Sequence, residues 1–324
     1  MRVAFVGKGG SGKTTLSALF TRQVAASGRT VVAIDADINQ HLGHALGAET
    51  APEPLGANLA ELKDWFRGDN PRVTSAESMV KTTPPGRGSR LLTLDSLTDP
   101  IHSAYAVRCP GGPYLMATGF FAEEDLGVAC YHSKVGAVEL YLNHLVDARE
   151  EYVVVDMTAG ADSFASGLFT RFDATFLVAE PTRQGVSVYR QYRDHAAEFG
   201  VPVVVIGNKI HDSDDVDFLR AEVGEDLLTC FEHSAAVRAM ERGRPLDAPD
   251  LEAANVAALT LMLLYVDGRE KNWPRYGDQA TELHLRNARG WANRAVGEDL
   301  AKQIDPGFVY GLRPAPCPPG VLSH

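Results

Sequence analysis

The strongest constraint on the fold is a glycine-rich run near the amino terminus, Gly7–Thr14, which reads GKGGSGKT. It lies between a buried-strand pattern, Arg2–Gly7, and a segment of helical character, Lys13–Ala26. Glycines there let consecutive backbone N–H groups face one anion, and the following helix adds its positive amino-terminal end. Such strand–loop–helix units cradle phosphate groups. The run therefore predicts an α/β fold with a phosphate site beside its first strand.

The side chains of this phosphate loop (Gly7–Thr14) have separate expected roles. Lys13 should reach the β and γ phosphates of a nucleoside triphosphate, and the Thr14 hydroxyl should ligate Mg²⁺. Other residues expected to bind the nucleotide here are Gly9, Gly10, Ser11, Gly12 and Thr15. A glycine-rich turn with an incidental lysine is the alternative, but the complete motif between a strand and a helix disfavours it.

Short β-branched runs alternate with helical patterns along the chain, which is typical of a parallel sheet with crossover helices. We therefore expect a three-layer α/β fold, with a mostly parallel sheet of about seven strands and helices on both faces. Strands are predicted at Arg2–Gly7, Val31–Asp35, Tyr114–Thr118, Tyr152–Asp156, Ala174–Ala179, Val203–Gly207 and Leu227–Cys230. Helices are predicted at Lys13–Ala26, Lys134–Ala148, Arg183–Phe199, Val216–Val223, Ser234–Arg242 and Leu251–Tyr265.

Two segments fall outside this alternation. Residues 48–112 read as an insertion into a P-loop domain of residues 1–267, on the side of the sheet where ligands bind, and its Pro84–Gly88 run must be a loop. Residues 268–324 read as a C-terminal extension with a polar helical stretch near Ala280–Lys302. Four prolines within Arg313–Gly320 predict that about the last dozen residues are flexible.

Composition excludes several classes of protein. A net charge of −11 disfavours general nucleic-acid binding, and four cysteines without paired spacing do not predict a disulfide framework. The longest apolar stretch, Val256–Val266, is shorter than the roughly 20 residues of a transmembrane helix. No signal-peptide pattern follows Met1. We expect a cytoplasmic protein without a transmembrane segment.

A second lysine, Lys8, narrows the class. The run Lys8–Thr15 resembles the deviant phosphate loop of a family that includes partitioning and division-site ATPases (ParA and MinD), the nitrogenase iron protein and the maturation ATPase of carbon monoxide dehydrogenase. The resemblance covers about residues 1–265 and implies a homodimeric ATPase in which Lys8 and Lys13 are catalytic. In that family the early lysine reaches the partner's nucleotide and neutralises charge on the transferred phosphoryl group. A solvated loop lysine is the alternative reading of Lys8.

Carboxylates at two strand ends complete the expected magnesium site. By the resemblance, Asp37 matches the first switch and orients the attacking water, while Asp35 helps to hold the water shell of Mg²⁺. Either one alone also fits a helix N-cap. Asp156, followed by Gly160, resembles the second switch, whose acid binds Mg²⁺ through water.

The base pocket is expected at Asn208 and Lys209. An asparagine amide can both donate and accept at the adenine edge, and family members use an asparagine here. GTP-selective relatives carry Asn-Lys-x-Asp, but here His211 takes the last position and Asp212 follows one residue late. We therefore favour ATP over GTP.

Within the family, the chain looks most like the subfamily that loads nickel into carbon monoxide dehydrogenase, as in Lys81–Gly86 and Glu180–Arg183. That subfamily carries Cys-x-Cys before the helix that precedes the second switch, and two subunits share one metal. Here the pair is Cys130 and His132, so a dimer would offer Cys₂His₂ to Zn²⁺ or Ni²⁺. A shared Fe₄S₄ cluster needs four thiolates, and two chains would supply only two of them at this place. This disfavours a role in electron delivery. Alternatively, Cys130 is a small buried side chain and His132 a solvated one.

Three functions stay open at this stage. The first is a metallochaperone-like maturation ATPase with a protein client, and the second is a partitioning or positioning ATPase that binds DNA or membrane in its ATP state. The third is a regulatory nucleotide-binding module with negligible turnover. The full set of site residues favours slow, partner-stimulated ATP hydrolysis over the third. The mixed charges of Ala280–Lys302 disfavour a membrane anchor.

The insertion and the extension exceed what nucleotide chemistry requires, and we expect them to recognise the client. Trp273, Tyr276 and Trp291 are candidate contacts. The alternative is that these aromatic side chains pack the extension onto the core.

Overall fold

The computed structural model describes residues 1–120, 131–160, 166–243 and 250–311. Within these ranges the chain forms one eight-stranded sheet in the order β3-β4-β2-β5-β1-β6-β7-β8, and every neighbouring pair is parallel except β3–β4. The strands are β1 Arg2–Gly7, β2 Thr30–Ala36, β3 Val107–Arg108, β4 Tyr114–Ala117, β5 Glu151–Met157, β6 Ala174–Ala179, β7 Val203–Ile210 and β8 Leu227–Glu232. The expected α/β class is confirmed. The sheet has one strand more than expected. The additional strand, β3, has only two residues and no apolar run, so the sequence pattern did not predict it.

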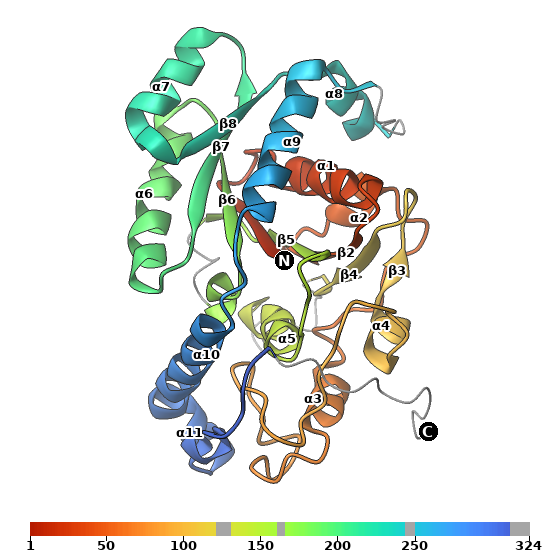
Figure 1. Cartoon of the computed structure of the whole chain (residues 1–324), viewed down its shortest axis with the longest axis vertical. Coiled ribbons are helices and arrows are strands. Elements are labelled where there is room, and N and C mark those ends of the chain that lie inside the picture. The colour runs from red at the N-terminus through yellow and green to blue at the C-terminus, as the bar shows by residue number, and fades with distance from the viewer. Residues whose placement is uncertain (121–130, 161–165, 244–249, 312–324) are drawn as a thin grey trace.

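Helices cover both faces of the sheet (Figure 1). Alternate strand residues pack against α1 (Lys13–Ala26) and α9 (Ala253–Asp267) on one face, where Phe5, Phe20 and Phe176 form an aromatic cluster. The opposite face packs against α5 and α6. The bounds of the other helices, α5 and α6 included, are α2 Leu42–Leu46, α3 Leu59–Arg67, α4 Pro100–Tyr105, α5 Tyr131–Asn143, α6 Arg183–Glu198, α7 Ser213–Val223, α8 Ala235–Glu241, α10 Trp273–Asn287 and α11 Asn293–Val296.

Two helices differ from their predicted bounds: one ends earlier than predicted and one begins earlier. Helix α5 stops at Asn143 instead of Ala148, because the backbone of Leu92 exchanges hydrogen bonds with His144 and Val146 and draws that segment into a β-bridge. The helix of the extension begins at Trp273 instead of Ala280, with the Asn272 side chain as its cap.

The insertion belongs to the core on the α5 face. Leu62, Phe66 and Ile101 lie in the same apolar cluster as the α5 side chains. Its middle part lies away from the ligand edge of the sheet where we expected it. Leu92 bridges to Leu145, and the Leu145 carbonyl accepts from Arg2 at the amino end of β1.

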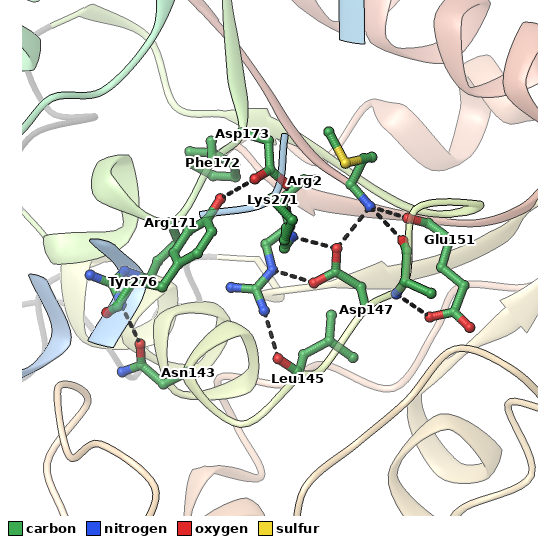
Figure 2. A network of polar contacts seen from close by, with 12 residues as sticks. Arg2, Asn143, Leu145, Asp147, Glu151, Arg171, Phe172, Asp173, Lys271 and Tyr276 are labelled. Carbon is green, nitrogen blue, oxygen red and sulfur yellow. Dashed lines mark hydrogen bonds and ion pairs between the residues drawn. The ribbon is translucent and has the colours of Figure 1, made fainter. Parts of the chain in front are cut away.

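The C-terminal extension is fastened to the sheet by a buried network of charges (Figure 2). Lys271 forms ion pairs with Asp147 and Asp173, and the Tyr276 hydroxyl donates to Asp173 over 2.8 Å. Tyr276 is fully buried, which supports the packing alternative for this residue.

The other two candidate aromatic contacts differ. Trp273 stacks on Tyr310 within the extension, whereas Trp291 is 46% exposed. The proline-rich end, residues 312–324, lies outside the described residues. In the part of the chain that is described, no helix is both long and apolar enough to span a bilayer.

Candidate nucleotide site

The backbone of the phosphate loop requires glycine at fixed positions. Gly7, Gly10 and Gly12 have φ angles of 145°, 82° and 95°, a region that side chains disfavour. A Cβ on Gly7 would lie 2.4 Å from the Val178 carbonyl oxygen of β6, and one on Gly12 would lie 2.2 Å from Asn208 Nδ2. The loop can therefore take this shape only with glycine at these places.

Thr14 and Asp156 meet at the centre of the site. Thr14 Oγ1 donates to Asp156 Oδ2 over 2.6 Å, which ties the start of α1 to the end of β5. The second oxygen, Asp156 Oδ1, is buried and has no hydrogen-bond partner among the described residues. Lys13 is buried beside them, with its Nζ 3.4 Å from the Lys8 carbonyl oxygen.

Buried carboxylates give this centre an excess of negative charge. Asp35 on β2 lies opposite Asp156 on β5 in the sheet register. Burial and the neighbouring charge of Asp35 raise the pKa of Asp156 to about 8, against the opposing effects of Thr14 and Lys13. Burial raises the pKa of Asp35 to about 7. A divalent cation would relieve this charge, and hydroxyl and carboxylate oxygens are the ligands that Mg²⁺ prefers. The residues present therefore fit Mg²⁺.

The two carboxylates after β2 make different contacts. Asp35 accepts from the backbone N–H of Asp37 over 3.2 Å and of Leu42 over 2.8 Å, so it holds the turn that leads into α2. Asp35 is not the helix N-cap that the sequence left open, because the N-cap of α2 is His41. Asp37 accepts from the backbone and side-chain nitrogens of Asn39 at 3.0 and 3.2 Å.

Lys8 is exposed on the phosphate loop. Its Nζ donates to Gln184 Oε1, in the first turn of α6, over 2.7 Å. Within one chain, Lys8 therefore contacts helix α6.

Asn208 and Lys209 brace the phosphate loop from the end of β7. Asn208 Nδ2 donates to the Ser11 carbonyl over 2.7 Å. Lys209, with a φ of 61°, donates to the Gly10 carbonyl over 2.7 Å and pairs with Glu180 at 2.5 Å. Both side chains therefore contact carbonyl groups of the phosphate loop.

A cavity of about 300 Å³ opens beside these two residues, a volume at the lower end of the range of small-molecule pockets. One wall contains expected residues, namely Gly12, Thr15, Asn208 and Lys209. The opposite wall comes from the end of β8 and from α8, which the sequence analysis did not include. Its lining residues are Phe231, Glu232, His233, Ser234, Val237, Arg238 and Glu241. In the sequence, only one feature indicates that these residues lie near a ligand site: they follow a strand that ends at the same edge of the sheet.

The proposed transition-metal pair cannot be placed in the same way. Cys130 lies outside the described residues, and His132 lies in the first turn of α5 without a described side chain. Elsewhere in the described chain, no group of three or more His, Cys, Asp or Glu side chains is arranged to hold a metal ion.

Comparison with known proteins agrees with this geometry. Residues 3–246 match the family described as the CobQ/CobB/MinD/ParA nucleotide binding domain. The carbon monoxide dehydrogenase accessory protein CooC of Rhodospirillum rubrum is 28% identical over 75% of this chain and 87% of its own length. An uncharacterized ATP-binding protein of Methanocaldococcus jannaschii is 26% identical over 79% of this chain and 95% of its own. Among solved structures, the septum site-determining protein MinD of Pyrococcus horikoshii, complexed with Mg-ADP, has a TM-score of 0.53, 17% identity, and coverage of 82% and 96% of the two chains.

Proposed function

The chain belongs to the CobQ/CobB/MinD/ParA nucleotide-binding family, and from this premise we propose that it hydrolyses ATP as a Mg²⁺-dependent, nucleotide-switched homodimer that matures a metalloenzyme. The observation that carries the proposal is the Thr14–Asp156 pair beside the buried Lys13, with one carboxylate oxygen of Asp156 left without a partner. These are the groups that a triphosphate and its magnesium require.

The phosphate loop supplies the binding energy for the triphosphate. Backbone N–H groups of Gly9–Thr15 would surround the phosphates, and the buried Lys13 side chain would lie inside the site. Thr14 and Asp156 would hold Mg²⁺, which neutralises phosphate oxygens when bound. Asn208 and Lys209 would position the base while they brace the loop.

Hydrolysis needs two further side chains. Asp37 would orient the attacking water, with Asp35 holding the turn that presents it. Lys8 would cross to the nucleotide of the partner subunit, which requires it to leave Gln184. Because the trans lysine arrives only when the dimer closes, the isolated chain would turn over slowly.

The maturation role rests on the likeness to CooC and on the Cys130-x-His132 pair. Two subunits together would offer two thiolates and two imidazoles, a tetrahedral set suited to Zn²⁺ or Ni²⁺. ATP-driven closure would then couple metal release to contact with a client protein. Metal analysis tests this part: Cys130→Ser should lose stoichiometric Ni²⁺ or Zn²⁺, while Cys230→Ser on β8 should keep it. No bound metal at micromolar concentrations in the unaltered protein would refute the maturation role.

Analytical ultracentrifugation tests the switch. Asp37→Ala should form a dimer with Mg-ATP and remain monomeric with ADP or with ATP and EDTA. A monomer under every condition would contradict the dimeric switch and leave nucleotide binding as the supported function.

The ATP-trapped Asp37→Ala protein should also retain its client in a pull-down. ATP-dependent retention on DNA by the same protein would instead favour the partitioning alternative.

A further inference from the structure

A groove separate from the nucleotide site runs between the insertion and the C-terminal extension. It encloses about 460 Å³, within the range of small-molecule pockets. Its walls are mainly proline and aromatic side chains: Pro84, Pro85, Trp273, Pro274, Pro306, Phe308, Val309 and Tyr310. Val309 on its rim is 61% exposed.

The aromatic side chains of the groove are held in fixed positions. Trp273 and Tyr310 stack with ring centroids 5.5 Å apart at 28°, and Phe308 meets Tyr310 edge-on at 5.7 Å. The Tyr310 hydroxyl donates to the Asn143 carbonyl at the end of α5. The Lys271 ammonium lies 4.9 Å from the centroid of the Trp273 ring. Such anchored rings lose little entropy when a ligand binds.

A ladder of rigid rings flanked by prolines suits one class of ligand. Polyproline II segments bind aromatic-lined grooves because their conformation is already formed before binding. The rim also carries Asp278, which is exposed and forms no ion pair with a described residue. A basic residue next to the prolines would therefore add a favourable charge contact.

We propose that this groove binds the proline-rich segment Arg313–Gly320 of the same chain. The segment reads RPAPCPPG and joins four prolines to one arginine. Its attachment point is already at the groove: Gly311 has a φ of 89°, and a Cβ there would lie 2.3 Å from Trp273 Cγ. A segment tethered two residues away reaches an effective concentration that a free peptide would match only near millimolar levels.

Cross-linking in the full-length protein tests this assignment, since Cys317 lies inside the segment. Cys130→Ser and Cys230→Ser remove competing thiols, and Cys109 is buried. Thr281→Cys places a thiol in the groove, and Ala254→Cys places a matched exposed thiol on α9. A short bis-maleimide is added, and the products are mapped by peptide mass spectrometry.

We expect the Thr281→Cys thiol to couple to Cys317 within one chain at least about tenfold faster than the Ala254→Cys thiol. Replacing Pro316, Pro318 and Pro319 with alanine leaves the tether length unchanged and should remove that advantage, because alanine does not favour the polyproline conformation. Equal rates at the two thiols, or an unchanged rate in the alanine variant, would overturn the proposal. So would coupling between two chains, which would assign the groove to a second copy.

Discussion

Lys271 Nζ lies 2.7 Å from Asp173 Oδ2, and this pair joins the C-terminal extension to the residue just before β6 (Figure 2). Asp147 accepts from the same ammonium group, from Arg2 Nε over 2.8 Å and from the amino-terminal nitrogen of Met1 over 2.7 Å. Burial alone would raise the pKa of Asp147, but the charges of Lys271, the amino terminus and Arg2 outweigh it and hold that pKa well below its usual range.

Replacing Lys271 should therefore destabilise the whole fold. Lys271→Met leaves the two carboxylates with too little positive charge, and breaking a buried pair in this way costs about 3–5 kcal/mol. Urea unfolding at neutral pH measures the loss. The control, Arg286→Met, breaks exposed pairs with Glu198 and Glu282 and should change little. If the two variants unfolded at the same urea concentration, the network would not stabilise the extension.

The same network sets how stability responds to acid. Because the folded pKa values of Asp147 and Asp173 are lowered, their contribution is present above the unfolded pKa near 4 and is lost as pH falls through the folded values. Lys271→Met should flatten this acid dependence of the unfolding free energy. A slope below about pH 4 as steep as that of the unaltered protein would contradict the assignment.

Magnesium binding should also depend on pH, but near neutral pH instead of in acid. Asp35 and Asp156 have raised pKa values, about 7 and about 8, so cation binding must displace protons. Affinity for Mg-ADP should rise from about pH 6 to about pH 8, by up to tenfold per unit for each proton released. Calorimetry in two buffers of different ionisation enthalpy counts those protons. Asp156→Asn should reduce the proton release to the part that Asp35 contributes, and Asp194→Asn on the exposed face of α6 should leave it unchanged.

Without magnesium, the raised pKa values act against folding. The unfolded carboxyl groups release their protons near pH 4, before the folded ones, so the apo protein should lose stability as pH rises from about 4 to about 8. Asp156→Asn removes the contribution of Asp156 and should stabilise the apo protein at the alkaline end. Thermal unfolding with EDTA checks the sign, and a variant less stable than the parent near pH 8 would contradict it.

A pair of glycine substitutions separates binding from stability. Gly12 and Gly28 both have positive φ angles, 95° and 82°, but only Gly12 faces a side chain, that of Asn208. Gly12→Ala should lower ATP affinity by about a hundredfold or more, because the loop must move away from its phosphate-binding shape. Gly28→Ala should cost only about 1–2 kcal/mol of stability. Equal ATP affinity in the two variants would show that the cradle tolerates a Cβ at residue 12.

The trans role of Lys8 has a distinct kinetic signature. Lys8→Ala should bind Mg-ATP with nearly unchanged affinity, since in one chain Lys8 contacts Gln184 on α6. Its hydrolysis rate should fall about a thousandfold, in line with cations supplied across an interface. Mixing it with Lys13→Ala should restore part of the activity if Lys8 serves the other subunit's site while Lys13 serves its own, because one site of the mixed dimer is then complete. No recovery in the mixture would argue that Lys8 acts in its own chain.

Much of the fold could be predicted because its signals are local. The bounds of β1, α1 and β6 match the expectation to the residue, since buried apolar runs and the glycine before Lys13 mark their ends. The end of α5 could not be predicted, because Leu92, more than fifty residues earlier, decides where its last turn opens. The two-residue strand β3 likewise has no pattern of its own.

The site shows the same division. The motif led to Thr14 and Asp156, and the structure brings the two together at 2.6 Å. It gave no indication that Asp35 would hold the turn into α2 through Leu42. The β8–α8 wall of the cavity beside Asn208 was not predicted either, because it depends on β8 lying next to β7, and no single segment encodes the order of the strands in the sheet.

Base selectivity offers the last test, and it depends on Asp212. In GTP-selective relatives an aspartate reads the guanine amine, but Asp212 is already the cap of α7 and accepts from the N–H groups of Asp214 and Asp215 at 3.0 and 3.2 Å. We expect ATP to bind at least about tenfold more tightly than GTP in competition against a fluorescent nucleotide. Asp212→Asn keeps a good cap and should leave that ratio unchanged. His211→Asp puts a carboxylate three residues after Asn208 and should shift the ratio toward GTP by about tenfold, because the new acceptor can pair with the guanine amine. A ratio that moves in Asp212→Asn but not in His211→Asp would mean that Asp212, despite its role in α7, reads the base.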